Sequence, residues 1–83
     1  MYIHLGNEMV VNENDIIGIF DLETTTVSKH SRKFLEVAEK QKQVINVSYE
    51  LPKSFIVTEC KGKKNVYISQ ISTSTLQKRS KIL

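Results

Sequence analysis

Residues 15–23 constrain the fold more than any other part of the sequence. Their apolar side chains alternate between the two faces of an extended chain, with Ile16, Phe20 and Leu22 on one face and Ile17 and Ile19 on the other. Because both faces are largely apolar, the pattern predicts a central β-strand that is covered on each side. The chain has only 83 residues, so a neighbouring subunit could supply one of the two covers.

A chain of this length has room for one small hydrophobic core, and we predict a single domain over residues 1–83. Such a core contributes only ~3–5 kcal/mol, and small domains usually add disulfides, a metal or a partner subunit. Cys60 is the one cysteine, so it cannot form an internal disulfide, and we expect it to be a small buried residue at a strand end. Neither His4 nor His30 has a cysteine at zinc-site spacing. Association of identical subunits is therefore the expected stabilising device.

Turn signals divide the remaining sequence into short strands and two helices. The predicted strands are residues 2–5, 9–11, 15–23, 44–49, 54–60 and 65–71, with tight turns at Gly6-Asn7 and around Gly62. The predicted helices are a main one from the N-cap Ser28 to about Gln43, and a short one from N-caps at residues 72–75 to about Arg79. The expected fold class is α+β, a small domain with a mostly antiparallel sheet in the order ββ β-α-β-ββ-α.

Charge is distributed unevenly along the chain. Residues 1–28 carry five acidic and no basic residues, whereas the chain from Lys29 onward carries all twelve basic residues and four acidic ones. Segments of opposite charge can attract one another between copies of the chain, and the basic part can instead face a polyanion. The simplest alternative is that the fold mixes the two segments over one surface.

The basic residues gather in three clusters, at the start of the main helix, at the hairpin tip and at the last helix. These clusters are Lys29, Arg32 and Lys33; Lys61, Lys63 and Lys64; and Lys78, Arg79 and Lys81. Exposed cations at such positions can reach the phosphates of double-stranded DNA. The predicted DNA contacts are Lys29, Arg32, Lys33, Lys53, Lys61, Lys63, Lys64, Lys78 and Arg79. Stacking on single-stranded bases is not expected, because no aromatic residue is interleaved with the clusters. Each cluster could also be only a solvated surface.

Signals for catalysis and for membrane insertion are weak. The three glycines stand apart, so no phosphate-binding loop is present, and no nucleophile has a base at motif spacing. We therefore expect no enzyme, no cofactor, no metal site and no small-molecule substrate; an enzyme of phosphorylated metabolites near Ser28 and Arg32 is the least favoured hypothesis. The first ten residues lack a signal peptide, and no apolar run approaches the ~18–20 residues of a membrane span, which indicates a cytoplasmic protein.

Four segments and the last helix carry a family pattern that covers nearly the whole chain. They are MYIHLG at 1–6, DIIGIFD at 15–21, PKSFIVT at 52–58 and VYIS at 66–69, followed by Ser72, Thr75, Leu76, Lys78 and Arg79. Together they resemble the RemA/RemB-like family of bacterial extracellular matrix regulatory proteins. The resemblance implies an α+β subunit, a ring-like homo-oligomer, and a transcriptional regulator that binds DNA to activate matrix and biofilm genes.

RemA-type sequences of this family have an arginine-rich turn between the strand after the first helix and the following strand. The corresponding residues 49–54 contain a glutamate, a proline and one lysine, Lys53. Thr75 and Arg79 in the last helix still match the family pattern. Two functions are therefore expected: a regulator that binds duplex DNA through repeated basic clusters of an oligomeric ring, and, as the alternative, an oligomeric protein-interaction module of the same family that does not bind DNA.

Overall fold

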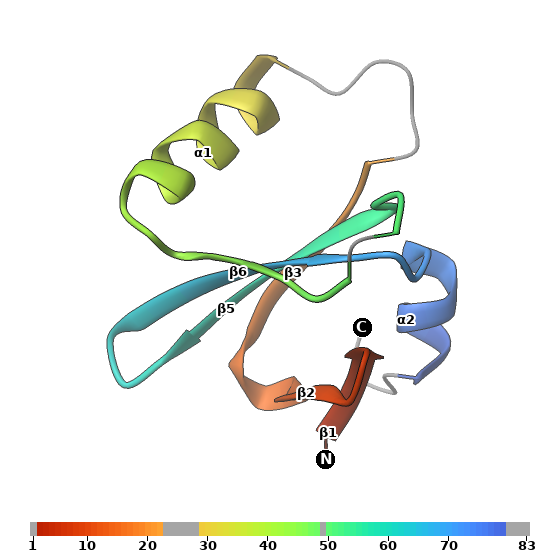
Figure 1. The fold of residues 1–83 in the computed structure, drawn as a ribbon. Coiled ribbons are helices and arrows are strands. Elements are labelled where there is room, and N and C mark those ends of the chain that lie inside the picture. The colour runs from red at the N-terminus through yellow and green to blue at the C-terminus, as the bar shows by residue number, and fades with distance from the viewer. Residues whose placement is uncertain (1, 23–28, 49, 80–83) are drawn as a thin grey trace.

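The computed structural model describes residues 2–22, 29–48 and 50–79 and shows an α+β fold (Figure 1). Its elements are β1 (Tyr2–Gly6), β2 (Met9–Asn12), a 3-10 turn η1 (Glu13–Asp15), β3 (Ile16–Asp21), α1 (Lys29–Lys40), β4 (Val44–Asn46), β5 (Ser54–Cys60), β6 (Lys63–Ser69) and α2 (Thr73–Arg79). The predicted fold class and order of strands and helices are confirmed.

The strands form two sheets. β1 pairs antiparallel with β2, and the other four form a sheet in the order β3-β5-β6-β4, antiparallel apart from the β4–β6 pair. The β5–β6 hairpin turns at Lys61 and Gly62, whose φ angles of 53° and 80° are both left-handed, as a tight two-residue hairpin requires. Strand β6 consequently starts at Lys63 rather than Asn65. Cys60 ends β5 beside this turn and is exposed, so the expected burial of its side chain is wrong.

β3 lies at an edge of the four-stranded sheet, so the prediction of a central strand is wrong. β5 and β6 occupy the central positions. The predicted division of the faces of β3 is also wrong, because the register shifts between Ile16 and Gly18 and places two residues of β3 opposite one of β5. After this bulge Ile17 shares a face with Phe20, while Ile16 packs on the opposite side.

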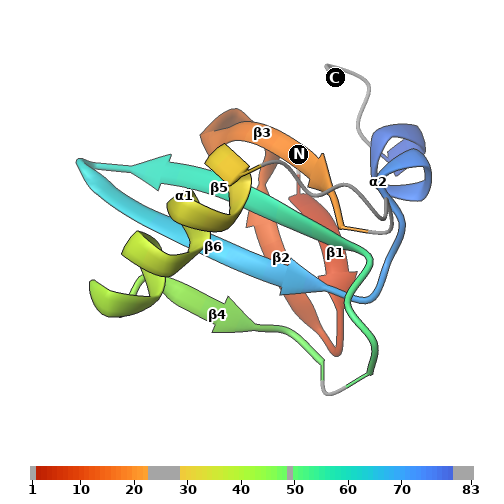
Figure 2. The ribbon, with the colours of Figure 1, turned by 90° about the horizontal axis from the view of Figure 1, so that it is seen from above.

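The two faces of the four-stranded sheet are covered by different elements (Figures 1 and 2). On one face the β1–β2 ribbon and α2 enclose a cluster of buried side chains: Ile3, Leu5, Val11, Val47, Ile56 and Leu76. On the other face Ala38 of α1 packs with Phe55, Val57 and Val66 of the central strands. The sheet therefore separates the β1–β2 ribbon from α1, which places their outer surfaces on opposite sides of the molecule.

α1 covers its face of the sheet incompletely. Ala38 is buried and Leu35 is half-buried, but Phe34 and Val37 on the same helix are 36% and 41% exposed. The helix ends at Lys40, three residues before its predicted end, and the predicted N-cap Ser28 lies outside the described residues. The part of the sheet next to β3 is thus left open on the α1 side.

Helix α2 and strand β4 are shorter elements at the sheet's border. Ser72 caps α2, since its Oγ accepts a hydrogen bond from the Thr75 N–H at 3.4 Å and its carbonyl accepts one from the Leu76 N–H at 3.0 Å. β4 ends at Asn46 rather than residue 49. Neither helix in the described part of the chain is long and apolar enough to span a membrane.

Ser69, which is buried, connects the two sheets. Its Oγ donates a hydrogen bond to the Leu5 carbonyl at 2.7 Å and accepts one from the Ile71 N–H at 3.0 Å. Ser54 Oγ donates to the Ile71 carbonyl at 2.7 Å. These bonds fix β1, β6 and the segment that enters α2 relative to one another, because each satisfies a polar group inside the core.

Candidate DNA-binding clusters and an apolar groove

The tip of the β5–β6 hairpin carries the first basic cluster. Lys61, Lys63 and Lys64 are all exposed, and the hairpin tip extends to one end of the molecule (Figure 2). Because consecutive strand residues point to opposite faces, Lys63 and Lys64 lie on different sides of the hairpin. Lys64 is opposite Glu59 in the β5–β6 register, so a carboxylate lies near one of the three charges.

The second cluster lies in the first half of α1. Arg32 and Lys33 are exposed and border a hollow together with His30 and Glu36, and Lys29 is the first residue of the helix. The first turn of α1 contains no acidic residue, so the positive end of the helix dipole is not offset there. The basic side chains and the helix dipole therefore both add positive potential at the start of α1.

The third cluster lies at the end of α2. Lys78 and Arg79 are exposed, and Arg79 Nη1 donates a hydrogen bond to the His4 carbonyl at 2.9 Å. A guanidinium has five N–H donors, so this contact leaves donors that could bind a phosphate. Lys81 lies outside the described residues.

Lys53 is exposed in the segment before β5. Its main-chain N–H donates to the Ser69 carbonyl at 2.8 Å, and its carbonyl accepts a hydrogen bond from the Leu22 N–H at 2.9 Å. These bonds hold the backbone of Lys53 at the border of the sheet. In the stretch that corresponds to the arginine-rich turn, residues 50–52 are exposed as well, whereas Ser54 at its end is buried.

One subunit does not bring all the basic clusters onto one face. The hairpin tip and α2 lie at opposite ends of the four-stranded sheet in both views (Figures 1 and 2). A duplex that contacts both clusters would have to cross the subunit or bind more than one copy. The predicted DNA contacts stay a prediction.

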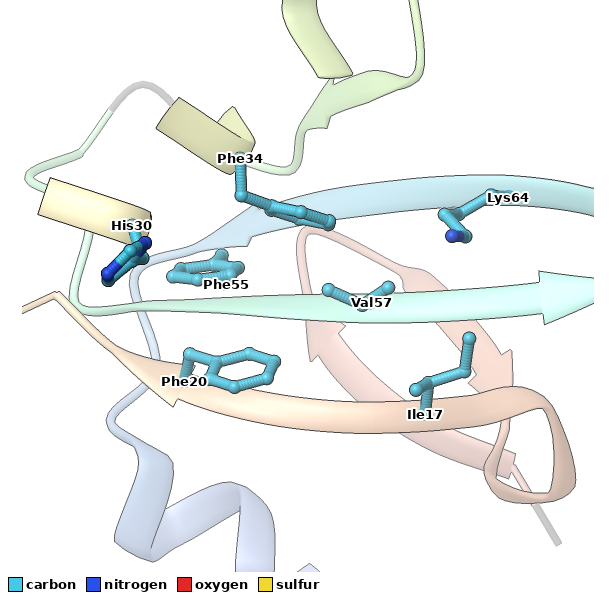
Figure 3. A pocket seen from close by; sticks show the side chains of 7 residues that line it. All are labelled: Ile17, Phe20, His30, Phe34, Phe55, Val57 and Lys64. Atoms are coloured by element: carbon cyan, nitrogen blue, oxygen red, sulfur yellow. The ribbon is translucent and has the colours of Figure 1, made fainter. Parts of the chain in front are cut away.

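An apolar groove, which the sequence patterns did not indicate, lies between α1 and β3 (Figure 3). Its volume is about 310 Å³, and its walls are Ile17, Phe20, His30, Phe34, Phe55, Val57 and Lys64. Apolar side chains from β3, β5 and α1 form the floor and the two sides. His30 and Lys64 lie toward opposite ends of the groove (Figure 3).

Three phenylalanine rings shape this groove. Phe55 is buried and lies between Phe20, at 4.8 Å between ring centroids, and Phe34, at 6.3 Å. Phe20 and Phe55 are also partners in the β3–β5 register. A Cβ at Gly18 would come within 2.8 Å of the Phe20 ring, so the glycine gives that ring its space. The apolar pattern of β3 predicts a strand covered on both faces, whereas Ile17 and Phe20 line an open groove.

The described residues show no metal-binding cluster. Within 2–22, 29–48 and 50–79, no group of three or more His, Cys, Asp or Glu side chains could hold a metal ion. His4 lies on β1 and His30 on α1, which are separated by the four-stranded sheet. The exposed basic clusters and the apolar groove are the surface features of the described residues that could bind a partner.

Comparison with known proteins gives two consistent matches. A family model described as RemA-like, extracellular matrix regulatory protein A-like, matches residues 2–80. The chain is also similar to the extracellular matrix regulatory protein B of Bacillus subtilis (strain 168), with 42% identity over 83 residues that cover 100% of this chain and 94% of the relative. Both matches extend over the strands and helices that carry the clusters and the groove.

Proposed function

The chain belongs to the RemA-like family of extracellular matrix regulatory proteins, and from this premise we propose that it is a cytoplasmic, DNA-associated transcriptional regulator of bacterial matrix and biofilm genes. In this proposal an oligomeric ring of identical subunits binds duplex DNA through its repeated basic clusters. The contacts are with the phosphate backbone, and DNA shape or bending supplies the sequence preference.

The exposed hairpin tip is the observation that carries the proposal. Three lysines within four positions, Lys61, Lys63 and Lys64, lie at one end of the sheet on a tight turn. A compact cationic tip of this kind can approach a DNA backbone without rearrangement of the core. Copies of the tip repeated around an oligomer would raise the avidity for a long duplex without any new type of contact.

The separation of the clusters supports binding by an oligomer rather than by one subunit. The tip and α2 face different ends of the molecule (Figure 1), so neighbouring subunits could each present a different cluster to one duplex. Each phosphate that is neutralised releases counterions, and affinity should therefore fall steeply as salt is raised.

A pair of matched double variants tests the assignment of the tip. Lys61→Gln/Lys63→Gln and Lys40→Gln/Lys42→Gln each remove two exposed positive charges, and each pair includes one residue with a left-handed φ, Lys61 at 53° or Lys42 at 58°. Fluorescence anisotropy with labelled duplex DNA should show weaker binding and a salt slope smaller by about 2 for the first pair. The second pair should bind with close to the parent affinity. Equal binding by both pairs would contradict the assignment.

A second candidate function, an oligomeric protein-interaction module that does not bind DNA, is favoured by the segment before β5. Residues 50–53 are exposed and carry Glu50, Leu51 and Pro52 next to a single lysine. Leu51 is 82% exposed, and a protruding apolar side chain suits a protein partner better than a phosphate backbone. In this candidate the acidic N-terminal part of one subunit faces the basic part of its neighbour.

Leu51→Lys distinguishes the two candidates. A DNA-binding protein should gain affinity for duplex DNA in the anisotropy assay, because a cation replaces an apolar side chain in the stretch that corresponds to the arginine-rich turn. A protein-docking module should show no DNA binding in either form.

A further inference from the structure

An apolar surface on the α1 side of the sheet is left uncovered in the single subunit. Ile17 and Phe20 on β3 are 56% and 43% exposed, and Phe34 and Val37 on α1 are 36% and 41% exposed. The first three of these side chains line the groove (Figure 3). Neighbouring exposed apolar residues around a hollow are typical of interaction surfaces, whereas single ones are common on any protein.

A second apolar surface lies on the other side of the molecule. Ile3, Leu5 and Val11 of the β1–β2 ribbon are buried against the core, while Tyr2 and Val10 are 66% and 41% exposed. The alternation of strand side chains places these two on the outer face of the ribbon, together with the exposed His4 opposite Val10. The four-stranded sheet separates this face from the groove (Figures 1 and 2).

The charges around the two surfaces are opposite in sign. Lys64, with Glu59 opposite it on β5, lies at one end of the groove, and Arg32 and Lys33 continue the basic surface along α1, with Glu36 among them. The ribbon carries the exposed Glu8 at its turn, and Glu13 and Asp15 follow in η1. Residues 2–22 contain no Lys or Arg, and the one cation bonded to the ribbon among the described residues is Arg79 of α2, at the His4 carbonyl. The acidic ribbon turn and the basic α1 side of the groove are thus complementary in charge.

On the premise that the chain oligomerises as proposed above, we propose that the groove of one subunit binds the outer face of the β1–β2 ribbon of a second copy. Tyr2 and Val10 of that copy enter the space lined by the phenylalanines, where an aromatic ring gains both apolar burial and ring contacts. The acidic ribbon turn then lies toward the basic rim of the groove.

Because the two surfaces differ, this contact is head to tail. A head-to-tail contact leaves one groove and one ribbon free at the ends of every incomplete assembly, so further copies add until a ring closes or a filament forms. The competing arrangement pairs the edge strands β3 of two copies about a two-fold axis. That arrangement is self-complementary and stops at a dimer.

Two complementary variants test the proposal. Ile17→Glu puts a charge into the groove and leaves the ribbon intact, and Tyr2→Glu does the reverse; both residues are more than half exposed in the subunit, so the fold should be retained. Each variant alone should be monomeric by light scattering after size-exclusion chromatography, with a dissociation constant raised by at least about 30-fold. An equimolar mixture should form a one-to-one dimer, since each variant keeps the surface that the other lacks. Asn46→Glu, at an exposed site of β4 outside both surfaces, should assemble like the parent.

Three results of this experiment would overturn the proposal. A parent chain that is monomeric, an Ile17→Glu variant that assembles normally, or two monomeric variants that do not combine would each contradict it. If circular dichroism shows that Ile17→Glu is unfolded, Ile17→Ser takes its place with the same expectations. The DNA-binding assignment is tested separately by the Lys61/Lys63 variants, because neither residue lines the groove.

Discussion

Arg79, in the last turn of α2, donates a hydrogen bond from Nη1 to the main-chain carbonyl of His4 in β1, at 2.9 Å and across 75 residues of sequence. The bond attaches the C-terminal helix to the N-terminal strand. The same side chain is exposed and is a candidate DNA contact. Among the described residues the side chain of Lys78 makes no such hydrogen bond. Arg79 therefore has a structural role that its neighbour lacks.

The two roles of Arg79 can be separated by comparison with Lys78. Arg79→Gln removes a charge and the bond to His4, and we expect a loss of about 1 kcal/mol in unfolding free energy, which corresponds to a melting temperature lower by about 4–8 °C. Lys78→Gln removes the same charge and should leave the melting temperature within experimental error. Both variants should bind DNA more weakly. Equal melting temperatures of the two variants would contradict a stabilising role of the Arg79–His4 hydrogen bond.

The hydrogen bonds of Ser69 predict a core defect in Ser69→Ala. The substitution removes the hydroxyl that donates to the Leu5 carbonyl and accepts from the Ile71 N–H. Buried polar groups that lose their partner cost about 1–3 kcal/mol, and urea unfolding should show a loss of that size. Gln77→Ala, at an exposed position of α2, should change stability by less than about 0.5 kcal/mol. A loss no larger than that of Gln77→Ala would contradict the connection between the sheets.

Lys61→Asn should raise stability while it lowers DNA affinity. Lys61 has a φ of 53° beside Gly62 at 80°, and an Asn-Gly pair is preferred over Lys-Gly in such a turn. We expect a gain of about 0.5–1 kcal/mol in unfolding free energy. Lys63→Asn removes the same charge outside the turn and should lower affinity without the gain. A Lys61→Asn variant that is no more stable than the parent would argue against the left-handed turn.

Assembly of the subunits should resist high salt. The groove contact buries mainly apolar side chains, with charges only at its rim, and apolar contacts are not weakened by ionic screening. Sedimentation in about 0.1 and 1 M NaCl, ionic strengths at which the screening length falls from ~10 to ~3 Å, should therefore give the same assembly size. Dissociation in high salt would favour the charge-driven arrangement of the second candidate function.

Local patterns in the sequence were sufficient to predict most elements. The tight turn after β1, the hairpin around Gly62 and the Ser72 cap each depend on neighbours within a few residues, and each is present. The first of these turns is formed by Asn7 and Glu8 rather than by the predicted pair Gly6-Asn7. The position of β3 could not be predicted in this way. Its two apolar faces fit a central strand, but strand order depends on which long-range pairs form, and a bulge after Ile16 reversed part of its alternation.

The candidate surfaces also divide into one that local sequence predicts and one that depends on long-range contacts. The lysines of the hairpin tip were visible as a cluster because they are close in sequence. The groove was not visible, because Phe20, Phe34 and Phe55 come from three elements that only the tertiary fold brings together. The contact of Arg79 with His4 joins the two ends of the chain and has no local sequence signal.

Binding to duplex DNA is the central claim, and fluorescence anisotropy of labelled AT-rich duplex with the purified parent protein tests it most directly. The measurement is repeated at several salt concentrations from about 50 to 200 mM, over which a protein with many phosphate contacts loses orders of magnitude in affinity. We predict saturable binding whose affinity falls steeply and linearly on a double-logarithmic plot against salt. No binding at the lowest salt would contradict the claim and would favour the protein-interaction module, with the exposed segment at residues 50–53 as its docking site.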